Sequence, residues 1–476
     1  MKTTKIFAIA LAVLAMTSCS KEEFNTQPTT SLAPSTIFAT TTTSYMAVNG
    51  ICRHMYQYLG SHGNAGQKSV DMVADLMGED LFPNARGYGW YVSDYDYTGL
   101  RNEQADRPHY IWSYFYDLVS NANMILKNVP NAVGPDSEKN DLMGQAYAYR
   151  AFGFFGAAQF YCKTYVGNEA EPGVPVYTEP TTVGKARPTL AITYKQIVDD
   201  LDSAILRLAK APKRADKSHI NLNVAKGLRA RVALEMGDWT NAAKYAKEAR
   251  TGFSLMNQDT YLKGFSSSEN AEWMWAGTIN DEQSTIYASF FSHIDPFAGG
   301  YATLGNHKLI NSKLYAKIDD NDVRKQTFDT DGSLTGKALC GFKFVLTGSG
   351  WAGDYCYMRA AEMYLIEAEA LAHSNEAEAK KVLEALLNAR GGVYDAAATG
   401  QALIEEIWLQ RRIELWGEGF RILDIKRQKV ALDRTGANHN STLWGISKLN
   451  ANAKEMLILI PKQELESNPL MKQNEL

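Results

Sequence analysis

The sequence predicts a mainly α-helical protein, in which stacked tetratricopeptide-like hairpins support an irregular, loop-rich lobe with a few short strands. Apolar residues recur at steps of three and four over much of the chain, which is the period of a helix with one buried face. Two segments, 221–250 and 358–390, each read as a helix, a short turn and a second helix. Long stretches punctuated by glycine and proline separate the helices and indicate loops.

The first hairpin is the clearer one. A helix beginning near Asn221 leads to the turn Gly237-Asp238-Trp239, and the helix after the turn carries alanines at positions where two helices cross. The second copy reads Met358 to His373 and then Glu376 to Arg390. Hairpins of this kind stack in a row, because each buries its apolar face only against its neighbours.

Further helices are expected around these hairpins. Amphipathic patterns run over 112–129, 142–161 and 192–208, while four prolines mark 171–188 as a loop. Small residues in the second of these helices, at Gly153 among others, allow a neighbouring helix to approach closely. A short strand is expected over 271–278.

Residues 1–18 have the features of a lipoprotein signal peptide. Two lysines precede an apolar run from Ile6 to Met16, which is too short to span a membrane. Small residues then lead to Cys19, as in a bacterial lipobox, although Met16 stands where leucine is usual. We therefore expect Cys19 to be the first mature residue and to carry the acyl chains that anchor the protein.

The remaining chain divides into a tether and one large folded region. Residues 19–42 are rich in threonine, serine and proline and show no apolar period, which predicts an extended tether. A helix is expected to begin near Thr43. The folded region then covers 43–476, with an amino-terminal part over about 43–270 and a carboxyl-terminal part over about 271–476.

The stretch 409–427 combines an apolar stripe with a charged face. The apolar stripe consists of Leu409, Ile413, Trp416, Phe420 and Leu423. The charged face consists of Arg411, Arg412, Glu414, Glu418, Arg421, Asp424 and Arg427. Gly417 and Gly419 predict a break between two helices. Carboxylates this close to several arginines are expected to be ionised partners in a buried structural element rather than general acids.

This stretch resembles the carboxyl-terminal signature of the SusD/RagB family, a run of the form RRxELxxEGxRxxDxKR. The matching positions are Arg411-Arg412, Glu414-Leu415, Glu418-Gly419, Arg421, Asp424 and Lys426-Arg427. The helix over 357–370 and the tail over 456–469 are also similar to segments of the family. Members are lipoproteins on the outer-membrane surface of Bacteroidetes that capture glycans or other nutrients and form a lid over a partner transporter.

The resemblance implies a SusD-like fold and a non-catalytic role. It implies a lipid-anchored protein facing the cell exterior, which binds an oligo- or polysaccharide and delivers it to a SusC-like, TonB-dependent outer-membrane transporter. A nucleic-acid partner is not expected, because the net charge is −4 and no basic block is present. Neither a cofactor nor a metal is expected.

Two irregular segments, 71–106 and 283–306, are the candidate ligand loops. Both are rich in aromatic residues, and the first also carries several aspartates. Aromatic rings pack against the C–H faces of sugars, and carboxylates accept hydrogen bonds from hydroxyl groups. Loop position and residue type suggest Asp75, Trp90, Tyr91, Phe291 and Tyr301 as ligand contacts. In this hypothesis the aromatic rings stack on the sugar and Asp75 accepts hydroxyl hydrogens.

Two other functions stay open from the sequence. A secreted glycoside hydrolase needs a suitably spaced pair of carboxylates, and no motif singles out such a pair. A protein that binds peptide nutrients, or a purely structural repeat protein, would share the helical hairpins but would not need such aromatic loops. Neither the ligand nor its class can be named from the residues alone.

Several smaller motifs favour structural roles. Residues 348–353 match GxGxxG after an expected strand over 342–346, but no βαβ unit surrounds them, so a flexible turn is favoured over a dinucleotide site. The acidic turn 319–322 is better explained as a helix cap than as a cation site. The cysteines other than Cys19 could form disulfides, but free buried thiols are favoured: Cys52, Cys162, Cys340 and Cys356.

Overall fold

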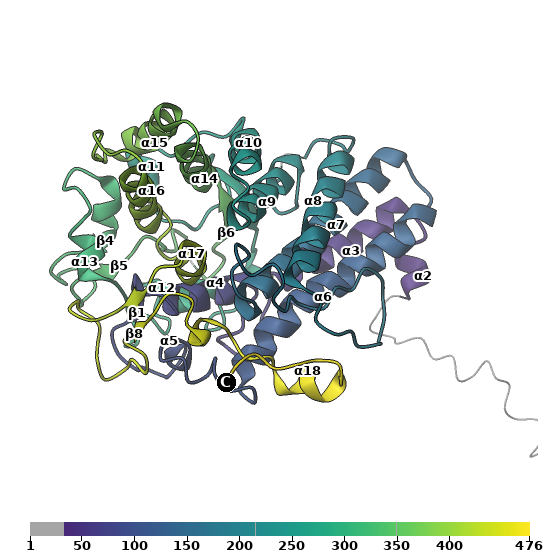
Figure 1. Cartoon of the computed structure of the whole chain (residues 1–476), viewed down its shortest axis with the longest axis horizontal. Coiled ribbons are helices and arrows are strands. Elements are labelled where there is room, and N and C mark those ends of the chain that lie inside the picture. Colours follow the sequence, from purple (N-terminus) through teal and green to yellow (C-terminus); the bar gives the residue numbers. More distant parts are fainter. Residues whose placement is uncertain (1–32, 215, 349) are drawn as a thin grey trace, which may run out of the picture.

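The computed structural model describes residues 33–476, apart from residues 215 and 349. Cys19 and the expected signal peptide therefore lie outside the described residues. Helices make up most of the molecule, and short strands gather on one side of it (Figure 1). The mainly helical architecture expected from the sequence is confirmed. Within the described residues, no helix is long and apolar enough to cross a membrane.

The amino-terminal part contains a bundle of long helices. The helices of this part are α2 (Pro34–Ile37), α3 (Thr41–His54), α4 (Gln67–Leu76), α5 (Val92–Tyr95), α6 (Asp106–Asn128), α7 (Asp136–Tyr161) and α8 (Leu190–Leu208). The bundle consists of α3, α6, α7 and α8, whereas α4 and α5 contact β1 (Leu81–Pro83). Helices α6, α7 and α8 lie side by side in Figure 1. Gly153 and Gly156 of α7 permit this packing, because a Cβ atom at either position would lie within 3 Å of Phe115 on α6. The close approach expected at these glycines is confirmed.

The two hairpins are present and pack against each other. The first consists of α9 (Leu222–Glu235) and α10 (Trp239–Arg250), and the second of α14 (Ala360–Ala372) and α15 (Glu376–Arg390). The Asp238 side chain caps α10 by accepting the Asn241 N–H. Helix α10 contacts α14, so the row α7, α8, α9, α10, α14, α15 is continuous although about a hundred residues separate the hairpins in sequence.

The inserted region and the carboxyl-terminal part supply the remaining elements. The helices are α11 (Gln258–Tyr261), α12 (Phe290–Ile294), α13 (Ser312–Tyr315), α16 (Gln401–Glu414), α17 (Arg421–Gln428) and α18 (Lys462–Ser467). The strands are β1 (Leu81–Pro83), β2 (Trp273–Gly277), β3 (Lys308–Ile310), β4 (Phe328–Asp329), β5 (Cys340–Gly341), β6 (Tyr355–Arg359), β7 (Leu432–Asp433) and β8 (Lys448–Leu449). An antiparallel sheet has the order β1-β3-β5-β4, while β2 pairs with β6 and β7 with β8.

The helix expected near Thr43 is α3, which begins at Thr41, and the short helix α2 lies within the last part of the expected tether. Two other expectations about local structure are wrong. The segment 71–106 is not wholly irregular, because α4 extends to Leu76 and β1 and α5 follow; the apolar period of α4 was hidden by the glycines after it. Residues 342–346 form no strand, and the glycines after them lead into β6 rather than directly into a helix.

The signature stretch forms the two expected helices, α16 and α17. Gly417 and Gly419 join them in the left-handed region, at φ 79° and 90°. Glu414 and Glu418 of the charged face are buried in a group of ion pairs, here called the buried ion network. Its members are Glu272, Arg324, Lys343, Arg359, Arg390, Glu414 and Glu418. The prediction of a buried, salt-bridged structural element is confirmed.

The ion pairs of the buried ion network are short, and most of its members pair with more than one partner. Arg359 lies 2.6 Å from Glu414, 2.6 Å from Glu418 and 2.7 Å from Glu272. Arg390 bridges Glu272 at 2.8 Å and Glu414 at 2.9 Å. Although burial raises it, the neighbouring arginines hold the pKa of Glu414 well below its usual range. The network thus joins β2, β6, α15 and α16 through charges that satisfy one another.

Candidate ligand-binding surface

Seven aromatic side chains from five loops meet at one surface, here called the aromatic platform. The members are Tyr58, His62, Tyr88, Trp90, Tyr287, Tyr301 and Trp351. The loops follow α3, β1, β2, α12 and β5 in the chain. No local sequence pattern brings these loops together; the fold does.

His62 and Tyr301 lie at the centre of the platform. The His62 Nδ1 and the Tyr301 hydroxyl are 2.8 Å apart and share a hydrogen bond. The His62 ring stacks on Trp90 at a centroid distance of 5.6 Å and on Tyr287 at 6.3 Å. Tyr301 also contacts Tyr88, Trp90 and Tyr287 at 5.4 to 5.6 Å. Tyr58, Tyr88, Trp90 and Tyr287 are therefore each held against one or both of the central side chains, and Trp351 lies against Tyr287.

A buried layer supports the centre of the platform. The His293 Nε2–H donates to the His62 carbonyl at 2.8 Å, and the His293 ring stacks on Tyr301 at 5.2 Å. Burial, with a contribution from the Lys308 ammonium, lowers the pKa of His293 to about 3, so the ring is neutral at physiological pH. The orientation of Tyr301 thus depends on an uncharged imidazole beneath it.

Backbone contacts hold the loops that carry the rings. Arg107 donates to the Gly63 carbonyl and to the Asn64 Oδ1, both at 2.7 Å, while its Nε is 3.1 Å from Asp94. Asn306 donates to the Trp90 carbonyl at 3.2 Å. These bonds fix the loops of His62 and Trp90 in place before any ligand arrives, which lowers the entropic cost of binding.

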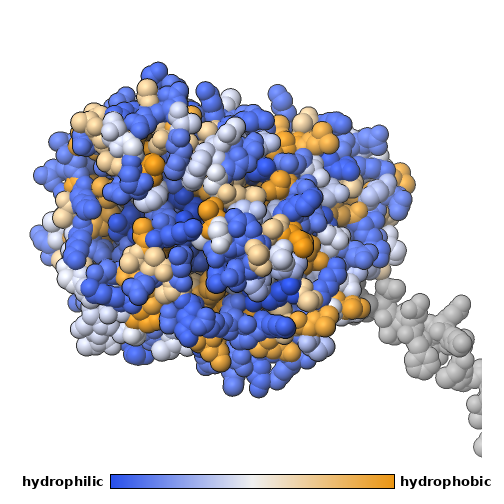
Figure 2. Space-filling model, in the orientation of Figure 1, coloured by the Kyte–Doolittle hydropathy of each residue, from blue (hydrophilic) through white to orange (hydrophobic). Residues whose placement is uncertain are grey.

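The outer rings of the platform are open to solvent. Tyr88 is 69% exposed, and Tyr58 and Tyr287 are each 44% exposed. His62, Trp90, Tyr301 and Trp351 are half-buried. The large face seen in Figure 2 is mainly hydrophilic, with hydrophobic residues in small separate groups. A cluster of solvent-exposed rings with free hydroxyl and indole edges is a surface suited to flat, hydroxyl-rich ligands.

The five residues suggested from the sequence fall in three places. Trp90 and Tyr301 come together in the platform. Tyr91 is buried just below it, where its ring lies 4.9 Å from His293 and its hydroxyl donates to the Gly63 carbonyl. Phe291 is fully buried and packs against Phe290 and Tyr355. Tyr91 and Phe291 therefore support the surface from inside and do not reach it.

Asp75 has a structural position, which corrects its suggested role. Its side chain is buried and accepts the backbone N–H groups of Gly419, Phe420 and Arg421 at the start of α17. Burial raises the pKa of Asp75 to about 7. Because both carboxylate oxygens are used within the protein, Asp75 has no free acceptor to offer a sugar hydroxyl.

Sequence reasoning missed His62, Tyr58 and Trp351. His62 lies in a glycine-rich turn after α3 that carried no functional pattern, and Trp351 lies within the GxGxxG match that was assigned to a turn. Only the unusual density of aromatic residues in loops pointed toward such a surface.

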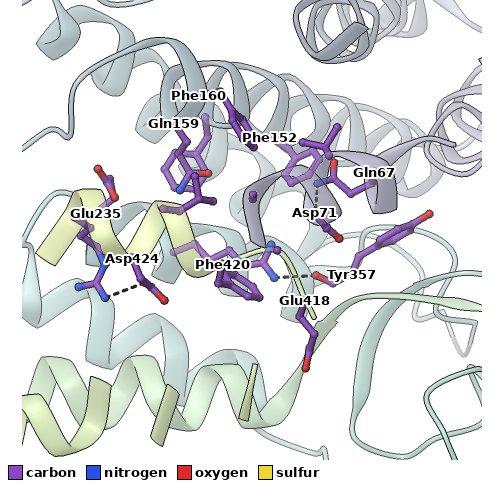
Figure 3. Close-up of a pocket in the computed structure, with 18 of the residues that line it drawn as sticks. Gln67, Asp71, Phe152, Gln159, Phe160, Glu235, Tyr357, Glu418, Phe420 and Asp424 are labelled. Atoms are coloured by element: carbon purple, nitrogen blue, oxygen red, sulfur yellow. Dashed lines mark hydrogen bonds and ion pairs between the residues drawn. The ribbon is translucent and has the colours of Figure 1, made fainter. Parts of the chain in front are cut away.

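A second place considered for a ligand is an interior cavity of about 80 Å³ between α4, α7, α9 and α17 (Figure 3). Its charged side chains are engaged with the protein: Arg231 pairs with Glu362 at 2.6 Å, and Arg411 pairs with Asp424 at 2.7 Å. The volume suits a few water molecules rather than a sugar ring. The cavity therefore lies at a junction between the two parts of the chain, where phenylalanine side chains and ion pairs both line it.

The acidic turn 319–322, which follows α13, caps the short 3-10 helix Val323–Thr327. The Asp322 side chain accepts the Arg324 N–H and also pairs with the Arg324 guanidinium, while Asp319 accepts from Asn321. The structural interpretation of this turn is confirmed. In the described part of the chain, no group of three or more His, Cys, Asp or Glu side chains is arranged to hold a metal ion. The four cysteines described are free thiols, as favoured from the sequence.

Comparisons with known proteins agree with this architecture. A family model described as "Starch-binding associating with outer membrane" matches residues 41–234, and the SusD family model matches residues 317–476. No curated protein sequence matches the chain.

Solved structures share the fold over nearly the whole chain. A SusD-like carbohydrate-binding protein from Bacteroides vulgatus has 25% identity and a TM-score of 0.82, covering 91% of this chain and 97% of its own. A SusD superfamily protein from Bacteroides thetaiotaomicron has 21% identity and a TM-score of 0.77, covering 92% and 100%. A laminarin-binding SusD-like protein has 21% identity and a TM-score of 0.68, covering 91% and 98%. Together with the two family models and the signature stretch, these matches show that the chain belongs to the SusD/RagB family.

Proposed function

We propose that this protein binds an oligo- or polysaccharide on the aromatic platform and does not process it. The observation that carries the proposal is the clustering of exposed Tyr88, Tyr58 and Tyr287 around the central His62–Tyr301 pair. Exposed rings cost free energy in water, and covering them with the C–H faces of a pyranose recovers part of that cost.

The shape and chemistry of the platform favour a chain of sugars over a single one. Rings from five loops spread the contact area, so several sugar units can be covered at once. The hydroxyl groups of the tyrosines and the indole N–H of Trp90 supply polar edges at the rim of the rings. Relatives described as carbohydrate-binding and laminarin-binding support a glycan as the ligand class.

We further propose that the protein works at the outer membrane. The family description associates a relative of the amino-terminal part with that membrane, and Cys19 would supply the lipid anchor there. A SusC-like, TonB-dependent transporter is the proposed partner, which receives the glycan that the platform holds. Retention of acyl chains on Cys19, and loss of membrane association in Cys19→Ala, are the expected results of metabolic lipid labelling and cell fractionation.

Affinity electrophoresis against a panel of polysaccharides tests the binding proposal. Migration of the folded protein should be retarded by at least one polysaccharide, and Trp90→Ala should restore most of the mobility. Tyr394→Ala is the matched control, because Tyr394 is an aromatic residue on a distant loop that contacts Glu384. Circular dichroism of each variant verifies that it remains folded.

Two outcomes would contradict the proposal. If a polysaccharide retards Trp90→Ala as much as it retards the parent protein, the platform is not the binding surface. Unretarded migration in every polysaccharide of the panel would remove glycan as the ligand class and would favour a peptide-like nutrient. Release of reducing sugar from a retained glycan would instead point to a hydrolase.

A further inference from the structure

Lys308, on β3, is a buried cation without a carboxylate partner. Its side chain is 1% exposed, and among the described residues no Asp or Glu lies within 4 Å of its Nζ. Buried lysines are rare unless they are paired, because an ammonium group loses its hydration on burial. The Lys308 Nζ instead donates to the backbone carbonyl and to the side-chain Oδ1 of Asn306, at 2.9 and 3.0 Å. The position of Asn306 is therefore fixed by a charge that the fold buries at a cost.

Asn306 joins two loops of the aromatic platform. Its Nδ2–H donates to the Trp90 carbonyl at 3.2 Å, and its backbone N–H donates to the Tyr301 carbonyl at 3.2 Å. A Cβ atom added at Gly87, in the loop of Trp90, would lie 3.0 Å from the Asn306 Cβ, so this loop rests directly on Asn306. Asn306 is itself 3% exposed. It therefore supports the rings of Trp90 and Tyr301 from the interior and does not reach a ligand.

The Lys308 ammonium decides which way the Asn306 amide faces. An ammonium has three donors and no acceptor, so it accommodates the amide oxygen and excludes the amide NH2 group. The Trp90 carbonyl only accepts, so it requires the NH2 group. Both neighbours therefore select the same orientation of the amide. A neutral amine can also accept a hydrogen bond, and it would permit the reversed orientation, in which the amide oxygen faces the Trp90 carbonyl and repels it.

The charge of Lys308 changes near neutral pH, whereas that of its titratable neighbours does not. Burial lowers the pKa of Lys308 to about 7, so the ammonium is present below that pH and is lost above it. Burial also lowers the pKa of the adjacent His307 and that of His293 on α12, the latter to about 3, and raises the pKa of the Cys340 thiol on β5 to about 12. Asp329 of β4 accepts N–H groups of its own turn, and β1 carries no titratable side chain. Of these groups, Lys308 alone changes its charge between about pH 6.5 and about pH 9.

We propose that Lys308 is a positioning residue of the aromatic platform, which holds the loops of Trp90 and Tyr301 in their ligand-binding arrangement through the Asn306 amide. This role rests on the proposed function, since the ligand is the glycan that the platform binds. Lys308 does not touch that glycan, yet the affinity for it depends on whether this buried side chain carries a charge. The affinity is highest with the ammonium present and falls as the proton is lost.

Asn306→Asp and Asn311→Asp form a matched pair of variants. Both asparagines are 3% exposed, and the Nδ2–H of each donates to a backbone carbonyl of another segment. The acceptor is Trp90 in the first case and Glu79 in the second. An aspartate keeps the oxygen that Lys308 holds but cannot donate to the Trp90 carbonyl. Isothermal titration with the polysaccharide that gives the strongest retardation in electrophoresis should show about tenfold weaker binding for Asn306→Asp and unchanged binding for Asn311→Asp.

Lys308→Met separates a role of the charge from a role of the packed side chain. Methionine fills much of the same apolar space but has neither the charge nor the donors. The affinity of the parent should fall by about threefold or more between about pH 6.5 and about pH 9, whereas that of Lys308→Met should be low throughout and should not fall further. Lys426→Met is the control, because Lys426 is also buried and donates only to backbone carbonyls, those of Gln159 and Cys162. It should keep the pH profile of the parent.

Hydrogen exchange of the free protein tests the positioning role without a ligand. Backbone amides of 84–91 and 301–306 should exchange faster in Asn306→Asp and in Lys308→Met than in the parent and in Asn311→Asp. If the parent binds no polysaccharide, the proposed function fails, while faster exchange in these two segments would still support the positioning role. Exchange at the parent's rate in both variants would overturn the proposal, and so would a parent-like affinity and pH profile of Lys308→Met.

Discussion

The buried ion network and the aromatic platform differ in how they accommodate side chains whose position costs free energy. The network buries charged side chains, and the desolvation cost is offset because each carboxylate pairs with two or more cations. The platform exposes rings, and it leaves their outer faces without a protein partner. Charged groups that are paired within the protein stabilise the fold, whereas aromatic faces without a protein partner are available to a ligand.

The comparison also separates two kinds of side-chain cluster within one chain. The carboxylates and arginines at the helix junction pair with one another, as the sequence predicts. The rings of the platform come from separate loops, and only the fold brings them to one surface. Each of the four predictions below changes one side of this contrast.

The largest effect is expected from Glu414→Ala. The substitution leaves Arg359 and Arg390 buried near one another with less opposing charge, which should lower the free energy of unfolding by about 3–5 kcal/mol. Denaturant unfolding followed by circular dichroism measures this change. Glu466→Ala, at an exposed helix position, is the matched control and should change stability little. Equal stability of the two variants would contradict a structural role for the network.

The second effect is a difference in acid sensitivity. His293 has an ordinary pKa of about 6.5 and a folded pKa of about 3, so the stability that it contributes is present above about pH 6.5 and is lost as pH falls toward 3. Although burial raises it, Arg359 and Lys343 hold the pKa of Glu418 at about 2, so its contribution is lost only as pH falls from about 4.5 toward 2. Acid should therefore weaken the platform before the network.

Unfolding at about pH 7.5 and about pH 5 measures this difference. Between these values the parent should lose about 2 kcal/mol through His293, and His293→Gln should lose correspondingly less. Glu418→Gln should retain the parent's loss over this interval and differ only at lower pH. Identical pH dependence in the parent and His293→Gln would show that His293 is not buried and neutral.

The third prediction is a loss of ligand affinity that is not accompanied by a loss of stability. Tyr287→Ala removes an exposed ring that rests against His62 and Tyr301, so it should weaken binding of the retained glycan by about tenfold, or about 1.4 kcal/mol. Isothermal titration measures the affinity. The midpoint of thermal unfolding should stay near that of the parent, because the ring is 44% exposed. A large loss of stability would instead place Tyr287 among the structural side chains.

The smallest effect is expected at an exposed ion pair, and it provides a reference for the other three effects. Lys195 and Asp199 form a close ion pair at 2.5 Å on α8, but both side chains are more than half exposed. Lys195→Ala should therefore change the free energy of unfolding by less than about 0.5 kcal/mol. A larger loss would show that ion-pair distance alone predicts stability in this protein, and the contrast between buried and exposed pairs would fail.

Much of the fold could be predicted because local sequence patterns determine the helices and their turns. The period of apolar residues located α6, α7 and α8, and the turn at Asp238 located the first hairpin. The glycine pair after α16 correctly marked the join between two helices, since left-handed backbone favours glycine. Helix α4 was missed because its pattern is short and is followed at once by glycine-rich loops.

The site was harder to predict because its contacts are long-range. His62 and Tyr301 are 239 residues apart, and Glu414 and Arg359 are 55 residues apart. Residue type and loop position correctly brought Trp90 and Tyr301 together on one surface. They could not distinguish those rings from the buried Phe291, nor reveal that the Asp75 carboxylate is used by the start of α17.

The platform draws its rings from five loops, each attached at both ends to elements that belong to the core. A change within one loop can therefore alter the one or two rings that it carries without disturbing the rings of the other loops. Such an arrangement is modular: the shape of the surface can change loop by loop while the interior that holds the loops stays the same.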